Sequence, residues 1–208
     1  MNDLFPRVNT NDFQSKEERF FYWFLVDLYN AGYVSNVLYE PYTYELSDAV
    51  TKSFVKQEQL KTKLKTTKGE ETIQKGLVYT PDFVVHWTQK ALGVFVETLN
   101  TKDKLMKGQS QTMFIGTIRG IDVITVFEVK PDFDQNNMTR YTKVKMNWLF
   151  QREAVFVNLV KLPSLFKKYF VPTRFLITDK SAKLRKIKFK VRNLEQFVNE
   201  VQAKTHND

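Results

Sequence analysis

Two apolar segments constrain the fold of this chain most, because each carries charge where a buried strand should have none. The segments are DVITVFEVK (122–130) and YTPDFVVHW (79–87), whose β-branched and aromatic residues favour buried strands. Asp82 lies near the start of the second segment, and Glu128 and Lys130 end the first. Residues two apart on a strand share a face, so Glu128 and Lys130 point toward one place. A buried carboxylate needs a cationic partner, and a divalent metal ion is one such partner.

The residue types of the chain restrict such a metal to oxygen ligands. The chain has no cysteine, which excludes disulfides and thiolate sites, and His86 and His206 are its only histidines. We therefore expect Mg²⁺ (or Mn²⁺) as the cofactor. His86 stands alone between Val85 and Trp87 and is interpreted as a structural strand histidine, not a catalytic base.

Length and charge define the class of protein. The 208 residues, 42% hydrophobic with 18 Phe, 9 Tyr and 3 Trp, indicate a globular domain. No apolar run approaches the roughly 20 residues of a membrane span, and the first residues lack the pattern of a signal peptide. We expect a cytoplasmic protein with no membrane partner. The net charge of +9 favours a polyanionic partner, although a basic surface also serves solubility.

The segment after Ser15 predicts an amphipathic helix that stops at Gly32. Its predicted core face consists of Phe21, Tyr22, Leu25, Leu28 and Tyr29. Glu18 begins the same stripe, so its carboxylate should point toward the sheet. Ser15 and Glu18 also form a capping-box pattern, which would explain Glu18 without any chemistry.

Further elements complete a sheet. The strand candidates are YVSNVLYEPYTYELSD (33–48), GVFVETLN (93–100), QTMFIGTI (111–118) and AVFVNLVKL (154–162). A helix is expected from about Asn137, with a core face of Tyr141, Val144, Trp148 and Leu149. Strand, helix and strand in this order imply a parallel crossover. Asp122 and Asp132 adjoin glycine or proline and are interpreted as turn residues.

Two basic segments stand apart from this core. Residues 51–75 hold seven lysines and three glutamates with few large apolar residues, which indicates either a solvated insertion or a basic flap over phosphates. After Pro163, LFKKYF predicts a short helix, VPTRFLIT a strand and NLEQFVNEVQA a terminal helix. Between the last two, residues 180–192 contain seven cations and no acid. From Lys186 the alternation of basic and apolar residues predicts an edge strand, where lysines either contact DNA or block strand pairing.

The pairs Pro81-Asp82 and Glu128-Val129-Lys130 resemble the signature of the PD-(D/E)XK nuclease superfamily. With Ser15-Lys16-x-Glu18 opening an aromatic helix, the order of motifs is similar to phage-encoded endonucleases and Holliday-junction resolvases. The resemblance implies an α/β (mixed α+β) fold: a helix, an antiparallel meander that carries the acids, a crossover helix and a parallel strand. Residues 1–162 would form this core, with a basic insertion at about 51–76, and residues 163–208 a basic extension packed on it. Glu97 is a rival second acid, but no lysine follows it at the required spacing.

The resemblance also implies an activity. Glu18, Asp82, Glu128 and Lys130 would be catalytic, and Asp82, Glu128 and the Val129 carbonyl would hold the metal with support from Glu18. Lys130 would orient or help deprotonate the attacking water. The implied function is metal-dependent cleavage of Holliday junctions or other branched DNA by a phage or mobile-element protein in a bacterial host. Two symmetric cuts would require a homodimer.

Two alternatives stay open, namely a nuclease subunit that cuts transposon or recombination ends within a larger complex, and an inert nucleic-acid-binding module. The candidate DNA contacts share positive charge and lie in the two basic segments or on the crossover helix. They are Lys61, Lys63, Lys65, Lys143, Lys145, Lys183, Arg185, Lys186, Lys188 and Lys190.

Overall fold

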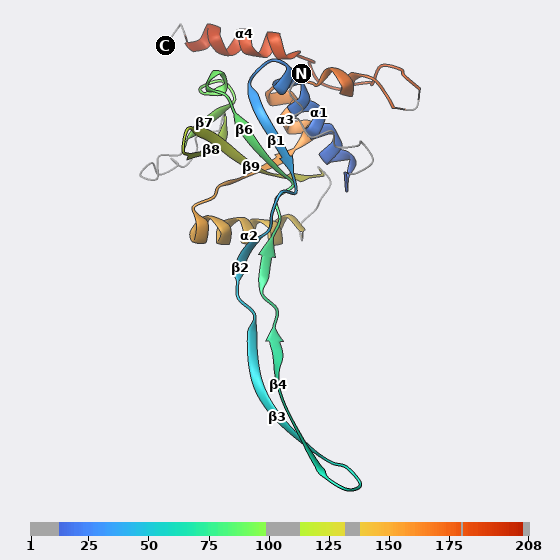
Figure 1. Cartoon of the computed structure of the whole chain (residues 1–208). Helices are drawn as coiled ribbons and strands as arrows, with labels where there is room; N and C mark the ends of the chain where they lie inside the picture. The colour runs from blue at the N-terminus through green and yellow to red at the C-terminus, as the bar shows by residue number, and fades with distance from the viewer. Residues whose placement is uncertain (1–12, 99–112, 132–137, 180, 206–208) are drawn as a thin grey trace.

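The computed structural model describes residues 13–98, 113–131, 138–179 and 181–205 (Figure 1). It is a mixed α+β structure built on one mixed sheet. In chain order the elements are α1 (Lys16–Asn30), β1 (Val34–Tyr39), β2 (Tyr44–Ser47), β3 (Val50–Gln59), β4 (Leu64–Gln74), β5 (Leu77–Tyr79), β6 (Phe83–Trp87), η1 (Gln89–Ala91), β7 (Val96–Thr98), β8 (Phe114–Arg119), β9 (Asp122–Lys130), α2 (Met138–Glu153), β10 (Val157–Lys161), α3 (Leu162–Lys168), η2 (Thr173–Leu176) and α4 (Leu194–Thr205). None of these described helices is long and apolar enough to cross a membrane.

The main sheet has the order β1-β6-β9-β8-β7, and β10 also pairs with β9. The pairs β1–β6, β6–β9 and β9–β8 are antiparallel, and β7 runs parallel to β8. After β9 the chain passes through α2 and returns as β10, which pairs in parallel with β9 from Val126 to Lys130. The expected meander and parallel crossover are therefore both present.

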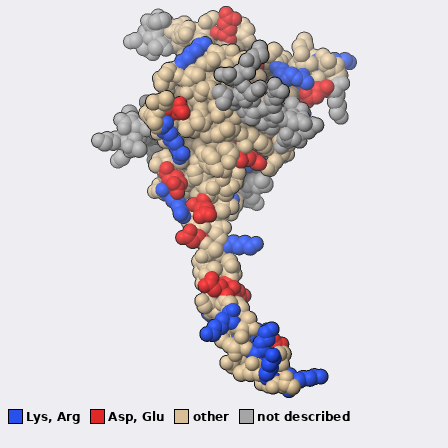
Figure 2. All heavy atoms as spheres, in the orientation of Figure 1, with Lys and Arg blue, Asp and Glu red and all other residues tan. Residues whose placement is uncertain are grey.

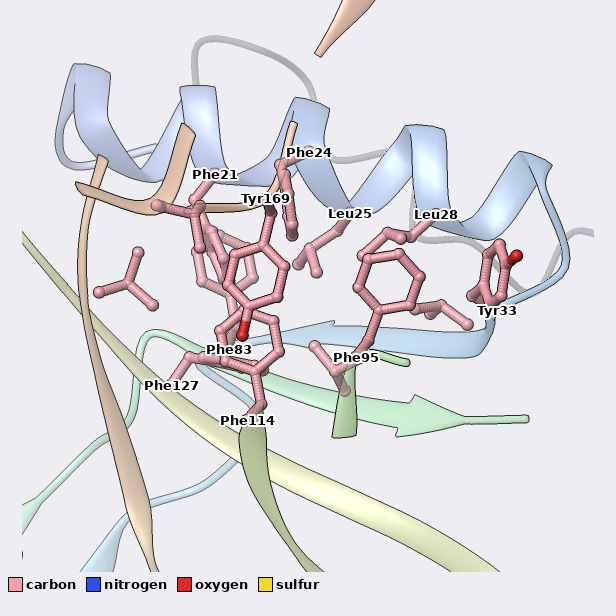
Figure 3. Close-up of a cluster of buried hydrophobic side chains, with 14 of the residues drawn as sticks. Phe21, Phe24, Leu25, Leu28, Tyr33, Phe83, Phe95, Phe114, Phe127 and Tyr169 are labelled. Carbon is pink, nitrogen blue, oxygen red and sulfur yellow. The ribbon is translucent and has the colours of Figure 1, made fainter. Parts of the chain in front are cut away.

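The two faces of the sheet have separate cores. On one face, aromatic rings of α1 such as Phe21 and Phe24 pack with Phe83 and Phe127 of the sheet and with Tyr169 (Figure 3). Helices α3 and α4 add to this core. On the other face α2 contributes one fully buried residue, Leu149, to a smaller cluster with β2, β5, β6, β9 and β10. Because side chains alternate along a strand, Val126 and Glu128 of β9 face this second side.

Asn158 of β10 ties together the three central strands. It is buried with 4% of its surface exposed, and its amide bonds both backbone groups of Ile115 on β8, at 2.9 and 2.8 Å. Its Nδ2 also donates to the Val126 carbonyl of β9 at 3.2 Å. Strand β8 pairs with the first part of β9, and β10 pairs with the part that follows. The Asn158 side chain thus satisfies backbone groups at the point where the partner of β9 changes from β8 to β10.

The structure corrects three predictions. Of the predicted core face of α2, only Leu149 is buried; Tyr141, Val144 and Trp148 are about half exposed. The segment VPTRFLIT forms the 3-10 helix η2 instead of a strand. The predicted edge strand from Lys186 alternates in exposure as expected, but pairs with no other strand among the described residues. Alternation reports which side chains face the core, whereas a strand also needs a neighbour.

The basic insertion is a long two-stranded arm that projects from the body (Figure 1). Strands β3 and β4 pair from Val50 to Gln59, and nearly all their residues are exposed. A short stem of β2 and β5 joins the arm to the body. As predicted, this segment adds nothing to the core, but it is a regular β-ribbon.

We predict that Asn158→Leu destabilises the fold by about 3 kcal/mol, because it leaves three buried backbone groups unpaired. Urea unfolding measures the change. Asn36→Leu on β1 is the control, since the Asn36 side chain makes no hydrogen bond within the described chain, and it should change stability by less than about 0.5 kcal/mol. Equal effects of the two substitutions would contradict the role assigned to Asn158.

Candidate active site

Asp82 lies one residue before β6, beside the end of β9. The pairing of Phe83 with Phe127 brings it next to Glu128 and Val129. The Asp82 amide donates to the Phe127 carbonyl at 3.1 Å, and its Oδ2 accepts the Val129 N–H at 2.6 Å. The sequence thus aligns its two charged strand ends by ordinary antiparallel pairing.

Glu128 is 6% exposed and both of its carboxylate oxygens have partners. Oε1 forms an ion pair with the Lys130 ammonium at 2.7 Å, and Oε2 accepts the Tyr79 hydroxyl at 2.7 Å. Lys130 is two residues along the same strand, as the sequence predicted. The role of Tyr79 at this site was not predicted. A buried tyrosine hydroxyl requires a partner, so the position of Tyr79 three residues before Asp82 was a usable signal.

Glu18 is also buried and lies at the start of α1. Its carboxylate accepts hydrogen bonds from the Ser15 hydroxyl at 2.7 Å, the Tyr39 hydroxyl at 2.7 Å and the Gln14 amide at 3.1 Å. Ser15 Oγ in turn accepts the Glu18 N–H, as an N-cap does. Both interpretations of Glu18 therefore hold in part, because it completes a cap and also faces the first strand of the sheet.

The electrostatics of the site centre on Asp82, whose pKa is raised to about 7. Burial is the largest cause and the negative charge of Glu128 the second, with a smaller contribution from Glu18. The Val129 N–H and the Lys130 ammonium act in the opposite direction. Three carboxylates thus share one ammonium, which leaves an excess of negative charge.

The two tyrosines remain hydrogen-bond donors. Burial, followed by the neighbouring glutamates, raises the pKa of both Tyr79 and Tyr39. Each hydroxyl therefore stays protonated and orients one carboxylate, Glu128 or Glu18.

The donor set fits a hard divalent cation at Asp82 and Glu128, because carboxylate oxygens suit Mg²⁺ and a cation would relieve their repulsion. Within the described residues, however, no three Asp, Glu, His or Cys side chains are grouped closely enough to hold a metal. Glu18 is held by its bonds to Ser15 and Tyr39. The pair Asp82 and Glu128 is thus the metal-binding candidate, and the roles of Glu18 and the Val129 carbonyl stay predictions.

The other acids and the histidine named from the sequence lie elsewhere. Glu97 is on β7, and burial followed by the charge of Glu97 raises the pKa of Tyr169. The His86 ring lies 3.7 Å from the carboxylate of Asp122, which supports a structural interpretation. Asp122 is the first residue of β9, directly after the turn at Gly120 and Ile121. Asp132 lies outside the described residues.

The predicted DNA contacts fall on three parts of the structure, namely the arm, α2 and the C-terminal extension. Lys61, Lys63 and Lys65 lie at the far end of the arm and are exposed. On α2, Lys143 is exposed, whereas the Lys145 ammonium donates to the Val78 carbonyl at 2.9 Å. In the C-terminal extension the lysines are exposed: Lys183, Lys186, Lys188 and Lys190. Arg185 instead pairs with Asp179 at 3.7 Å and packs on aromatic rings.

Comparisons with known proteins found no family model, no curated protein and no solved structure that matches this chain. Membership of the PD-(D/E)XK superfamily therefore remains a resemblance. It rests on Glu18, Pro81-Asp82 and the segment from Glu128 to Lys130.

We predict that Asp82→Asn gains stability relative to the natural chain as pH rises from about 4 to about 7. Between about pH 4 and pH 7 the Asp82 carboxyl ionises in the unfolded chain but stays largely protonated in the folded chain, which lowers the stability of the natural chain. The asparagine side chain does not ionise, so Asp82→Asn avoids this loss. At 1.36 kcal/mol per pKa unit the limit is about 4 kcal/mol, and we expect about 2 kcal/mol because Asp82 is partly open to solvent. Urea unfolding at several pH values measures the difference. The exposed substitution Asp48→Asn should show none, and parallel curves for Asp82→Asn and the natural chain would contradict the assignment.

Proposed function

We propose that this chain is a Mg²⁺-dependent endonuclease that hydrolyses phosphodiester bonds in branched DNA. One observation supports it most: Asp82 and Glu128 are crowded together at adjacent strand ends, beside a lysine on the same strand as Glu128. Repulsion of this kind is costly for folding and is useful where a cation binds. A bound Mg²⁺ would stabilise charge that develops on the phosphate and would lower the pKa of water.

Each residue has a distinct role in this proposal. Asp82 and Glu128 would hold the cation, and Asp82 would have to be deprotonated to do so, since ligands must be deprotonated. Lys130 leaves its ion pair with Glu128, orients the attacking water and offsets charge on the scissile phosphate. Tyr79 keeps Glu128 in place during this exchange through its hydroxyl.

The arm supports a nucleic-acid substrate. Its lysines gather toward the far end, while acids lie nearer the root (Figure 2). The far half holds Lys56, Lys61, Lys63, Lys65 and Lys68 against Glu58, and the root holds Lys52 and Lys75 against Asp48, Glu70 and Glu71. A two-stranded ribbon fits the major groove of DNA. At about 3.4 Å per residue the ten paired positions span roughly 34 Å, which is the length of about ten base pairs. The tip of the arm would therefore contact duplex DNA about ten base pairs away from the stem.

We predict that Asp82→Ala and Glu128→Ala each lower cleavage of a four-way DNA junction in Mg²⁺ by at least about 10³-fold, because each removes charge that holds the cation. Binding of the junction in Ca²⁺ should be unchanged. Glu97→Gln, at the rival acid, is the matched control and should cleave normally. Normal cleavage by Asp82→Ala would exclude this site. Binding without cleavage by the natural chain would instead favour the inert binding module.

We predict that the triple substitution Lys61→Ser, Lys63→Ser and Lys65→Ser weakens junction binding and lowers the slope of log affinity against log salt by about 2 to 3. Lys52→Ser with Lys75→Ser at the root is the control and should change the slope by less than about 1. The loss should also vanish on junctions whose arms are shorter than about ten base pairs. An unaltered slope in the triple variant would mean that the arm does not contact phosphates.

A further inference from the structure

The C-terminal extension encloses an apolar groove that the proposed nuclease activity does not use. Its volume is about 890 Å³. Phe20 of α1, Leu162 and Phe166 at α3 and Phe175 of η2 line one side, and the segment from Lys183 to Phe189 lines the other. We refer to it as the extension groove.

One wall of the extension groove is the irregular segment 186–191, which bends at Lys188 and Phe189 and pairs with no strand among the described residues. From Lys186 to Lys190 exposure alternates, so that Ile187 and Phe189 are half-buried against the main core while the lysines are exposed. The chain is pinned at both ends, because the Arg185 N–H donates to the Leu176 carbonyl and the Arg192 carbonyl accepts the Val171 N–H. Between these points, residues 186–191 make no backbone hydrogen bond within the described chain. The backbone N–H and C=O groups of this segment can therefore bond to an extended segment of another chain.

The rim of the extension groove carries an excess of positive charge. Its exposed cations are Lys167, Lys183, Lys186 and Lys188, with Glu17 as the one acid among the described lining residues. Next to it, the single carboxylate of Asp179 pairs with three guanidinium groups, those of Arg19, Arg174 and Arg185, at 2.8, 3.2 and 3.7 Å. An acidic occupant would therefore be favoured over a neutral or basic one.

The aromatic rings of the groove argue against a nucleic acid as the occupant. Bases bind single-strand grooves by stacking on open ring faces. Here the Arg185 guanidinium lies 5.2 Å from the ring centre of Phe20 and 4.8 Å from that of Phe175. Phe166 packs against Phe175 with ring centres 4.8 Å apart. The Lys167 ammonium lies 5.8 Å from the ring centre of the fourth aromatic residue, Phe189. The aliphatic part of the lining includes Leu162, Ile187 and Leu184, and Leu184 is 79% exposed. This surface suits apolar side chains.

We propose that the extension groove binds an extended acidic segment of a partner protein. The segment bonds to backbone groups of residues 186–191, its apolar side chains fill the groove, and its carboxylates meet Lys183, Lys186 and Lys188. The proposal stands on the extension alone and does not depend on the nuclease activity.

The test uses the full chain and a fluorescein-labelled twelve-residue peptide in which glutamate alternates with valine or leucine. Fluorescence anisotropy should detect binding, and hydrogen exchange should show protection of amides in residues 186–191 when the peptide is present. A peptide of the same composition with its acids and apolar residues in separate blocks should bind at least tenfold more weakly. A peptide with lysine in place of glutamate should not bind.

Variants of exposed residues keep the test independent of folding. The double substitution Lys186→Glu with Lys188→Glu should lower the affinity for the acidic peptide at least tenfold and should allow the lysine peptide to bind. Leu184→Ser should lower the affinity for the acidic peptide severalfold. Lys143→Glu with Lys63→Glu, on α2 and the arm, is the matched control for charge and should leave peptide binding unchanged. Junction binding in Ca²⁺ by Leu184→Ser should equal that of the natural chain, which separates this groove from the nuclease proposal.

Three results would overturn the proposal. The first is absence of binding by the alternating peptide. The second is equal binding of the alternating and block peptides without protection of residues 186–191, since only charge would then be recognised. The third is binding of oligothymidylate, but not of the peptide, in a manner that Lys186→Glu with Lys188→Glu abolishes, which would assign the groove to nucleic acid.

Discussion

The repulsion between Asp82 and Glu128 is the constraint on which the proposed chemistry depends. A buried carboxylate beside a partly buried one is unfavourable, and the rest of the site compensates through Lys130, the Val129 N–H and the Tyr79 hydroxyl. These contacts follow from strand pairing and strand alternation. The compensation is incomplete, since the pKa of Asp82 is still raised to about 7. A bound cation would supply the positive charge that compensates these two carboxylates.

Sequence reasoning found what local patterns determine. Apolar composition located β6 and β9, and the charges at their ends were enough to expect Asp82 beside Glu128. The cap at Ser15 and the aromatic stripe after it located α1. Tyr79 and Tyr39 were missed because their partners are 49 and 21 residues away, and no periodicity reports a contact of that kind.

The predictions that were wrong concern surfaces whose contacts cannot be inferred from the local sequence. Helix α2 has apolar residues on several sides, and only the face that holds Leu149 meets the sheet, so Tyr141 and Trp148 remain half exposed. Alternation after Lys186 correctly separated inward from outward residues but implied a strand partner that the described chain does not supply. In the arm, low apolar content correctly excluded a core, while cross-strand pairs such as Lys52 with Glu71 and Glu58 with Lys65 favour a ribbon.

Helix α1 links the two proposed sites physically. Glu18 faces Tyr39 of the sheet beside the catalytic candidates, whereas Glu17 and Phe20 line the extension groove. Neighbouring residues of a helix point about 100° apart, so one rigid turn serves both surfaces. The bond from the Tyr39 hydroxyl to Glu18 fixes this turn to the sheet, and the Arg19 pair with Asp179 fixes it to the extension. Helix α1 thus contributes Glu17 and Phe20 to the extension groove, and through Glu18 it contributes to the negative charge that raises the pKa of Asp82.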